Sequence, residues 1–240
     1  MTPPTHADLS TAERSDALVL AIDTCGPSGS AALGLLNAGS VEILGQTELA
    51  GRSYSATLVA AVSELLNRAG TAVARIHAIV AVNGPGSFTG VRVGLSAVKG
   101  LAEVSHTPVV AVSRLEVLSA RGGVASSALD AHRHEVFLRL SEGGQPPRDF
   151  LCGADELGSI RPIPAQIAVC DVAAELLSAV WSAVEFVQTS APTAADALRL
   201  CAPRIERGEF VDLALLDGHY LRRSDAEIFG EAVAAGLKRA

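Results

Sequence analysis

Aromatic side chains and positive charge are both scarce in this chain of 240 residues. Aromatic residues make up 4% and hydrophobic residues 49%, so the core must be built from small aliphatic side chains in closely packed elements. The formal net charge is −7, and no run of basic residues is longer than two. Since contacts to phosphates require clustered Lys and Arg, this balance argues against a broad nucleic-acid surface.

Metal-binding and membrane-spanning patterns are missing as well. The four cysteines (Cys25, Cys152, Cys170 and Cys201) form no CxxC pair, which leaves buried free thiols as the expectation. No two histidines stand four apart. His132 and His134 would share one face of an extended strand, but without a third ligand nearby an exposed turn is favoured over a metal site. The apolar run 17–22 is far shorter than the ~20 residues that cross a bilayer, and we expect a cytoplasmic protein.

The first half of the chain alternates between two hydrophobic periods. Residues 1–15 are polar and proline-containing, which predicts a disordered leader. Three strands in succession are then expected, followed by helices and strands in alternation, which is typical of a mixed sheet covered by helices. The expected strands are 18–23, 30–36, 40–49, 76–82 and 107–112, and the expected helices are 54–69, 91–105 and one that starts at 115. This order is that of a ribonuclease-H-like or actin-like lobe.

The second half is less regular. It predicts strands at 127–129, 135–140 and 167–170 and helices at 172–183 and 194–207, with residues 211–216 and 220–222 closing the fold. A boundary near Ser113 would give an N-terminal lobe, residues 16–113, and a C-terminal lobe, residues 114–225. Residues 226–240 are expected to form a charged helical tail.

A glycine-rich loop separates the strand at 76–82 from the next helix. Its sequence is Gly84-Pro85-Gly86-Ser87-Phe88-Thr89-Gly90. Glycines allow close backbone approach, Ser87 and Thr89 can cap the helix, and N–H groups at a helix N-terminus can hold an anion. The loop lacks the Gly-Lys-Ser/Thr of a P-loop. Two interpretations stay open: a phosphate-binding loop, or a tight turn that seats the following helix.

Residues 84–94 resemble the signature of the TsaB (YeaZ) family of bacterial tRNA threonylcarbamoyladenosine biosynthesis proteins. Further segments resemble the same family: Leu20 to Thr24, the helix after Ser55, residues 107–116, Asp130-Ala131 with Glu135-Val136-Phe137, and Tyr220-Leu221-Arg222. The resemblance covers roughly the first 140 and the last 25 residues, and 141–210 carries no matching motif. Tyr54, His132 and the pair Gly218-His219 depart from the family's usual residues.

The resemblance implies an α/β protein of actin-like, ribonuclease-H-like (ASKHA) type, with two lobes of mixed sheets flanked by helices. It implies a non-catalytic scaffold or activating subunit, paired with the catalytic paralogue TsaD. That enzyme transfers a threonylcarbamoyl group to the N6 of adenosine 3′ of the anticodon in tRNAs reading ANN codons. The ATPase TsaE is a further implied partner, ATP and metal are expected in the catalytic partner alone, and tRNA is expected to be reached only through the complex. A homodimer is implied when the chain is alone.

The residues themselves also argue against catalysis. Kinases and ATPases of this fold hold Mg-ATP with Asp-x-Gly turns, but here the first turn reads Asp23-Thr24-Cys25-Gly26 and no Asp-x-Gly occurs anywhere. Asp23 is either structural or a vestigial site residue. Cys25 has no motif-linked base that would make it a nucleophile. An autonomous ATP-dependent phosphotransferase or hydrolase that uses the glycine loop is the alternative function.

Two helices of the first lobe carry small, uncharged residues where a solvated surface would show Lys and Glu. These residues are Ala56, Val59, Ala60, Ser63 and Asn67 on the first helix, and Val93, Ala97, Gly100 and Val104 on the second, beside a charged strip of Arg92, Lys99 and Glu103. Such faces suit a four-helix contact with a partner. Coverage by the chain's own tail is the alternative, and the resemblance favours the partner.

Overall fold

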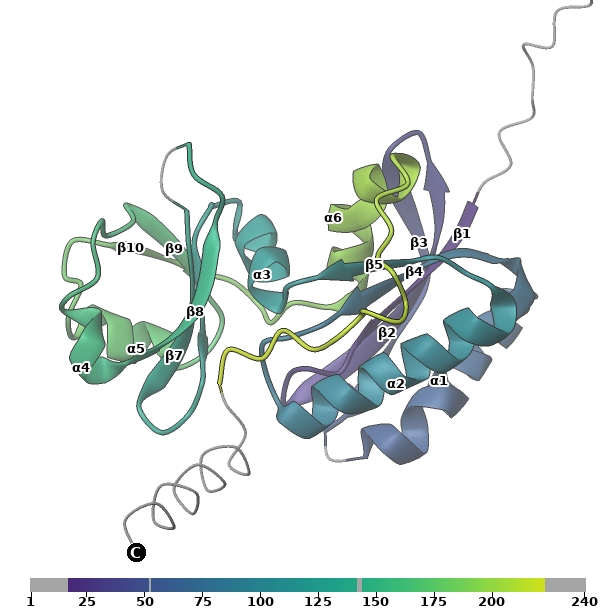
Figure 1. Cartoon of the computed structure of the whole chain (residues 1–240), viewed down its shortest axis with the longest axis horizontal. Helices are drawn as coiled ribbons and strands as arrows, with labels where there is room; N and C mark the ends of the chain where they lie inside the picture. The colour runs from purple at the N-terminus through teal and green to yellow at the C-terminus, as the bar shows by residue number, and fades with distance from the viewer. Residues whose placement is uncertain (1–16, 52, 142–143, 223–240) are drawn as a thin grey trace, which may run out of the picture.

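The computed structural model describes residues 17–51, 53–141 and 144–222. The expected leader at 1–15 and the expected helical tail at 226–240 lie outside the described residues. Two five-stranded sheets, each covered by helices, form two lobes side by side (Figure 1).

The first sheet has the strand order β3-β2-β1-β4-β5. Its strands are β1 (Ala17–Asp23), β2 (Ser28–Asn37), β3 (Ser40–Ala50), β4 (Ile76–Val82) and β5 (Val109–Val112). The first three are antiparallel neighbours, whereas β4 pairs in parallel with both β1 and β5. Because β1 and β4 are covered on both faces, they read as continuous apolar runs. The expected mixed sheet, with a three-strand meander at its start, is confirmed.

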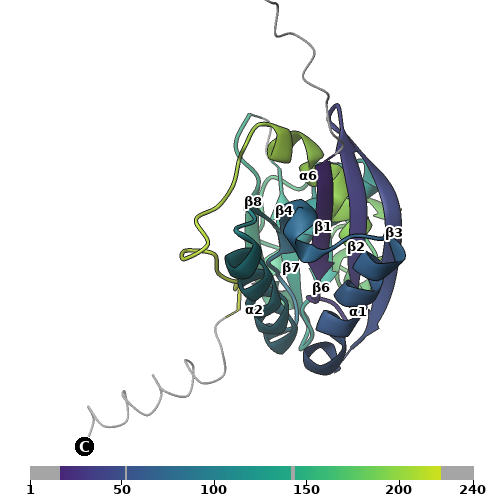
Figure 2. The ribbon, with the colours of Figure 1, turned by 90° about the vertical axis from the view of Figure 1, so that its right-hand side faces the viewer.

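Helices α1 (Tyr54–Arg68) and α2 (Phe88–Ser105) cover one face of this sheet, and α6 (Ala194–Glu206) lies on the other (Figures 1 and 2). A capping box of Thr193 and Asp196 starts α6, and its buried face contacts strands of the first sheet. The expected boundary at Ser113 assigned this helix to the C-terminal lobe. The structure differs, because the chain returns to the first lobe to cover its open sheet face.

The second sheet has the order β10-β9-β6-β7-β8. Its strands are β6 (Ser127–Asp130), β7 (Glu135–Leu140), β8 (Arg148–Gly153), β9 (Gln166–Val169) and β10 (Glu185–Gln188), and its helices are α3 (Arg114–Gly122), α4 (Ala154–Leu157) and α5 (Ala173–Ser178). The one tryptophan, Trp181, is buried here and its indole N–H donates to the carbonyl of Leu157 at 3.1 Å. The helix expected at 172–183 ends early, and the turn that follows buries Trp181.

Residues 211–222, which we call the strap, run from the first lobe to the second without forming a helix or strand (Figure 1). Val211 forms a bridge with Val109 of β5, and the His219 N–H donates to the Asn83 carbonyl at 2.6 Å. At its end, Arg222 donates to the Ala131 carbonyl in the second lobe. The strap therefore ties the two lobes together. Among the described residues no helix is long and apolar enough to cross a membrane.

Candidate functional site

The glycine loop packs directly against the turn that follows β1. The N–H of Ser87 donates to the carbonyl of Cys25 at 2.8 Å, and the Ser87 hydroxyl accepts from Gly90 at 3.2 Å. A Cβ on Gly86 would lie 2.1 Å from the Cys25 carbonyl oxygen, and one on Gly90 would lie 2.1 Å from that of Thr24. The Ser87 N–H is therefore bonded to this chain's own backbone, and Gly86 and Gly90 allow the loop to pack closely against the turn at Thr24 and Cys25. Ser87 is the N-cap, so α2 begins at Phe88 rather than at Val91.

Arg114, at the start of α3, places a buried guanidinium beside Asp23. Arg114 is only 5% exposed, and its Nε lies 3.5 Å from Oδ2 of Asp23. Oδ1 of Asp23 also accepts a hydrogen bond of 2.8 Å from the N–H of Cys25. Burial by itself lowers the pKa of Arg114, but the charge of Asp23 and other negative groups raise it above its ordinary value. The charge of the Asp23 carboxylate is therefore balanced by a buried cation of the same chain.

Cys25 and Tyr54 complete this closed turn. Burial, reinforced by the charge of Asp23, raises the pKa of the Cys25 thiol well above its ordinary value, so the thiol is protonated at neutral pH. The Tyr54 hydroxyl donates to the Gly26 carbonyl at 2.8 Å, and burial raises its pKa to about 12. Neither group is poised for nucleophilic or acid–base chemistry, and Asp23 has a structural role here.

The two histidines considered as metal ligands lie on a turn rather than on one strand face. His132, Arg133 and His134 all have positive φ, between 56° and 61°, in the connection from β6 to β7. His132 Nδ1 lies 2.8 Å from Asp130 Oδ2. Within the described ranges, no group of three His, Cys, Asp or Glu side chains is placed to hold a metal ion.

A polar cluster joins β8 to the strap and to the lobe boundary. Asp149 accepts from the Ser113 hydroxyl at 2.6 Å and from Arg139 at 2.7 Å, and Nε2 of His219 lies 3.3 Å from it. Burial by itself raises the pKa of Asp149, but the contacts with His219, Ser113 and Arg139 outweigh it and hold the pKa below its usual 3.8. This carboxylate is therefore a charged link between the lobes.

Asp149→Asn is expected to lower the free energy of unfolding by about 1–2 kcal/mol at neutral pH, because it removes a charge-assisted hydrogen-bond acceptor. A group whose folded-state pKa is depressed contributes stability above its unfolded pKa and loses it as pH falls through the folded pKa. The difference between the two proteins should therefore shrink below about pH 4. Urea unfolding across pH measures this difference, and one that stays constant with pH would contradict the assignment.

The proposed partner surface is an exposed helical face with a groove in it. Val59 is 65% exposed and Val104 83%, and five of the other expected residues (Ala56, Ala60, Ser63, Asn67 and Gly100) are exposed too. Val93 and Ala97 are half-buried against the first core. A groove of about 370 Å³ lies along α1 and α2 and brings together Val59, Ser63, Asn67 and Ala97. Its floor is apolar and includes Leu58, Val62 and Leu101.

Sequence reasoning missed Arg114 and Asp149 as residues of the lobe junction. Arg114 stands two residues after the strand that ends at Val112, but nothing in the sequence indicated that its side chain turns into the protein. Asp149 lies in a segment without a matching motif. For Arg114, one feature of the sequence could have indicated a buried role: this chain has few basic residues, and this one stands in an apolar region. For Asp149 the sequence offers no such feature.

Parts of the chain are similar in sequence to known proteins. A family model for tRNA N6-adenosine threonylcarbamoyltransferase (TsaD) matches residues 44–144. The tRNA threonylcarbamoyladenosine biosynthesis protein TsaB of Bacillus subtilis is 40% identical over 93 residues, which are 37% of this chain and 41% of that protein. TsaB of Escherichia coli is 34% identical over 125 residues, 50% of this chain and 52% of its own length. The matches thus span about half the length of these curated relatives.

Among solved structures, YeaZ from Pseudomonas aeruginosa superposes with a TM-score of 0.69 at 27% identity, covering 85% of this chain and all of the other. A second Pseudomonas aeruginosa structure, described as similar to peptidase YEAZ, gives a TM-score of 0.70 at 28% identity over 86% of this chain. The fold is therefore the expected actin-like, ribonuclease-H-like one. In its signature loop, its partial sequence relatives and its fold, the chain is similar to proteins of the TsaB/YeaZ family.

Proposed function

We propose that this chain acts in tRNA threonylcarbamoyladenosine biosynthesis as a non-catalytic subunit that pairs with, and activates, the threonylcarbamoyltransferase TsaD. The observation that carries the proposal is the contrast between the two candidate sites. The turn at Asp23 is filled by Arg114 and by the glycine loop, whereas the α1–α2 face is open, uncharged and grooved. A closed centre with an open helical face suits a protein that binds a partner rather than a substrate.

The proposed complex works in the cytoplasm, with ATP, metal and the transfer of the threonylcarbamoyl group to adenosine assigned to TsaD. The ATPase TsaE joins the same assembly, and tRNA is reached through the complex. A homodimer of this chain would use the same α1–α2 face and would therefore compete with TsaD. Reconstitution of tRNA modification with and without this chain tests the proposal, since modification that proceeds at full rate without it would overturn the activating role.

Ala60→Arg is expected to abolish pairing with TsaD. Ala60 is exposed on α1, and a guanidinium at the centre of a buried helical contact would be left unpaired, which weakens binding by about 100-fold or more. Ala97→Arg, next to the groove, should act in the same way. Co-purification of the two subunits measures the effect.

The control is Ala179→Arg, an exposed alanine of the second lobe. It adds the same side chain away from α1 and α2, and pairing should be unaffected. Circular dichroism confirms that each variant is folded. Normal pairing of both Ala60→Arg and Ala97→Arg would count decisively against the proposed surface.

The alternative function is an autonomous ATP-dependent phosphotransferase or hydrolase. The strand–loop–helix arrangement at residues 84–90 favours it, because helix N-termini bind phosphate. Calorimetry with Mg-ATP on the isolated chain separates the two proposals. Micromolar binding or turnover would favour the enzyme, and the absence of both is the result that the closed turn predicts.

A further inference from the structure

A second hollow lies between α2 and the strap, and its Arg222 end reaches the lobe junction. It has a volume of about 470 Å³, which falls within the range of small-molecule sites. Its floor is apolar, made by Leu95 and Leu216, both nearly fully buried. The proposed α1–α2 groove shares no residue with this hollow, and Phe88 is the one residue of the glycine loop that lines it.

One wall of the hollow is a row of polar side chains on α2. Arg92, Ser96 and Lys99 recur at the i, i+4, i+7 spacing and share one helix face, with the two cations about 10 Å apart along the axis. In the part of the chain that the structure describes, no carboxylate lies within ion-pair distance of Arg92 or Lys99. These charges are therefore available to a ligand.

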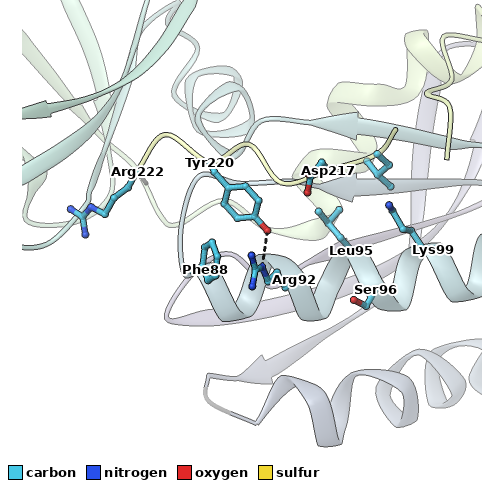
Figure 3. Close-up of a pocket in the computed structure, with 9 residues that line it drawn as sticks. Phe88, Arg92, Leu95, Ser96, Lys99, Asp217, Tyr220 and Arg222 are labelled. Carbon is cyan, nitrogen blue, oxygen red and sulfur yellow. Dashed lines mark hydrogen bonds between the residues drawn. The ribbon is translucent and has the colours of Figure 1, made fainter. Parts of the chain in front are cut away.

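Two aromatic rings, Phe88 at the start of α2 and Tyr220 on the strap, fix the position of Arg92. Its guanidinium carbon lies 3.7 Å from the centre of the Phe88 ring and 5.9 Å from that of Tyr220, and its Nε donates to the Tyr220 hydroxyl at 3.4 Å. The two rings are 5.0 Å apart. Figure 3 shows the Tyr220 ring turned toward Arg92, with Lys99 further along the helix. A cation stacked in this way is held in place before any ligand arrives.

Two further charged residues, Arg222 and Asp217, line the hollow, and they leave the positive charge of Arg92 and Lys99 in place. Arg222 pairs with Glu135 and points toward the second lobe, so its charge is already balanced (Figure 3). Asp217 is the one acidic side chain on the lining, and its carboxylate accepts from the N–H of Gly218 at 2.7 Å. The hollow as a whole stays positive on the α2 side.

We propose that this hollow binds a small organic phosphate: an anionic phosphate ester attached to a flat ring. The phosphate would lie against the Arg92–Ser96–Lys99 row, and the ring would lie on Leu95 and Leu216 beside Tyr220. Two cations on a row about 10 Å long fit an extended molecule better than a lone inorganic ion. The proposal goes beyond the assembly role, and its failure would leave that role untouched.

Titrations on the full chain, followed by NMR or calorimetry, test the proposal with three matched probes. Phenyl phosphate carries both the ring and the charge, inorganic phosphate only the charge, and phenol only the ring. We expect saturable binding of phenyl phosphate, at least about tenfold tighter than binding of either other probe. Equal affinity for phenyl phosphate and inorganic phosphate, or no saturation by phenyl phosphate, would overturn the proposal.

Single substitutions test which side chains contact phenyl phosphate. Arg92→Gln and Lys99→Gln should each weaken phenyl phosphate by about tenfold, as expected for a lost charged hydrogen bond. Tyr220→Leu should weaken phenyl phosphate by about fivefold and leave inorganic phosphate unchanged. Arg199→Gln, which removes an exposed arginine from α6 on the opposite face of the sheet, is the control. If it weakens binding as much as Arg92→Gln does, the effect is general electrostatics and the site is refuted.

Discussion

Replacing Gly90 with alanine is expected to destabilise the protein by about 3 kcal/mol, whereas Gly100→Ala on the same helix should stabilise it. At Gly90 the new Cβ would lie 2.1 Å from the carbonyl oxygen of Thr24, a backbone atom in a buried turn. Neither side can yield without moving β1 away from α2, which also breaks the hydrogen bond from the Thr24 hydroxyl to the Gly90 carbonyl. Overpacking of this kind costs about 1–3 kcal/mol or more.

Gly100 supplies the matched control. It is exposed, and a Cβ there meets no atom within 4 Å. Alanine should therefore add about 0.5–1 kcal/mol through helix propensity alone. Thermal unfolding followed by circular dichroism measures both variants, and a change of 3 kcal/mol corresponds to roughly 6–12 °C at this chain length. Equal changes for the two variants would refute the close contact between α2 and the turn at Thr24.

Arg114→Met is expected to cost about 3–5 kcal/mol, because it leaves the carboxylate of Asp23 buried without its countercharge. The same change in an exposed arginine, Arg199→Met, should cost less than about 1 kcal/mol, although that arginine also faces a carboxylate. The contrast isolates burial as the cause.

A double substitution decides whether the charge or the packing matters. Adding Asp23→Asn to Arg114→Met removes the unpaired charge but keeps an oxygen that accepts from the N–H of Cys25. We expect the double variant to recover at least half of the lost stability. Urea unfolding of the four proteins of this cycle measures the coupling, and additive losses would mean that Asp23 and Arg114 do not stabilise each other.

Much of the first lobe could be predicted because its elements have strong local patterns. β1 and β4 are continuous apolar runs, and α1 shows Leu58, Val62 and Leu65 at helical spacing. The glycine loop was correctly placed between strand and helix. The start of α2 was misplaced by three residues, since the cap is a property of the Ser87 side chain and backbone together.

Two strands of the second lobe, β8 and β10, could not be predicted from the sequence, for a physical reason. β8 and β10 are short strands with mixed burial, so neither alternation nor an apolar run marks them. The return of α6 to the first sheet is a tertiary event that no local pattern encodes. The same holds for the candidate sites: the polar row from Arg92 to Lys99 was visible as a charged strip, but the opposing Tyr220 comes from a segment 128 residues away from Arg92.

The position of α6 also sets the order in which the protein can fold during synthesis. The five strands of the first sheet have all been made once the ribosome reaches Val112, yet the helix that covers their second face ends only at Glu206. At ~5–20 residues per second, about 5–20 s pass between these two points. Throughout that time all five strands of the first sheet have been synthesised, but the helix that covers one apolar face of that sheet has not. The second lobe must be translated, and has time to fold, before the first lobe can be finished.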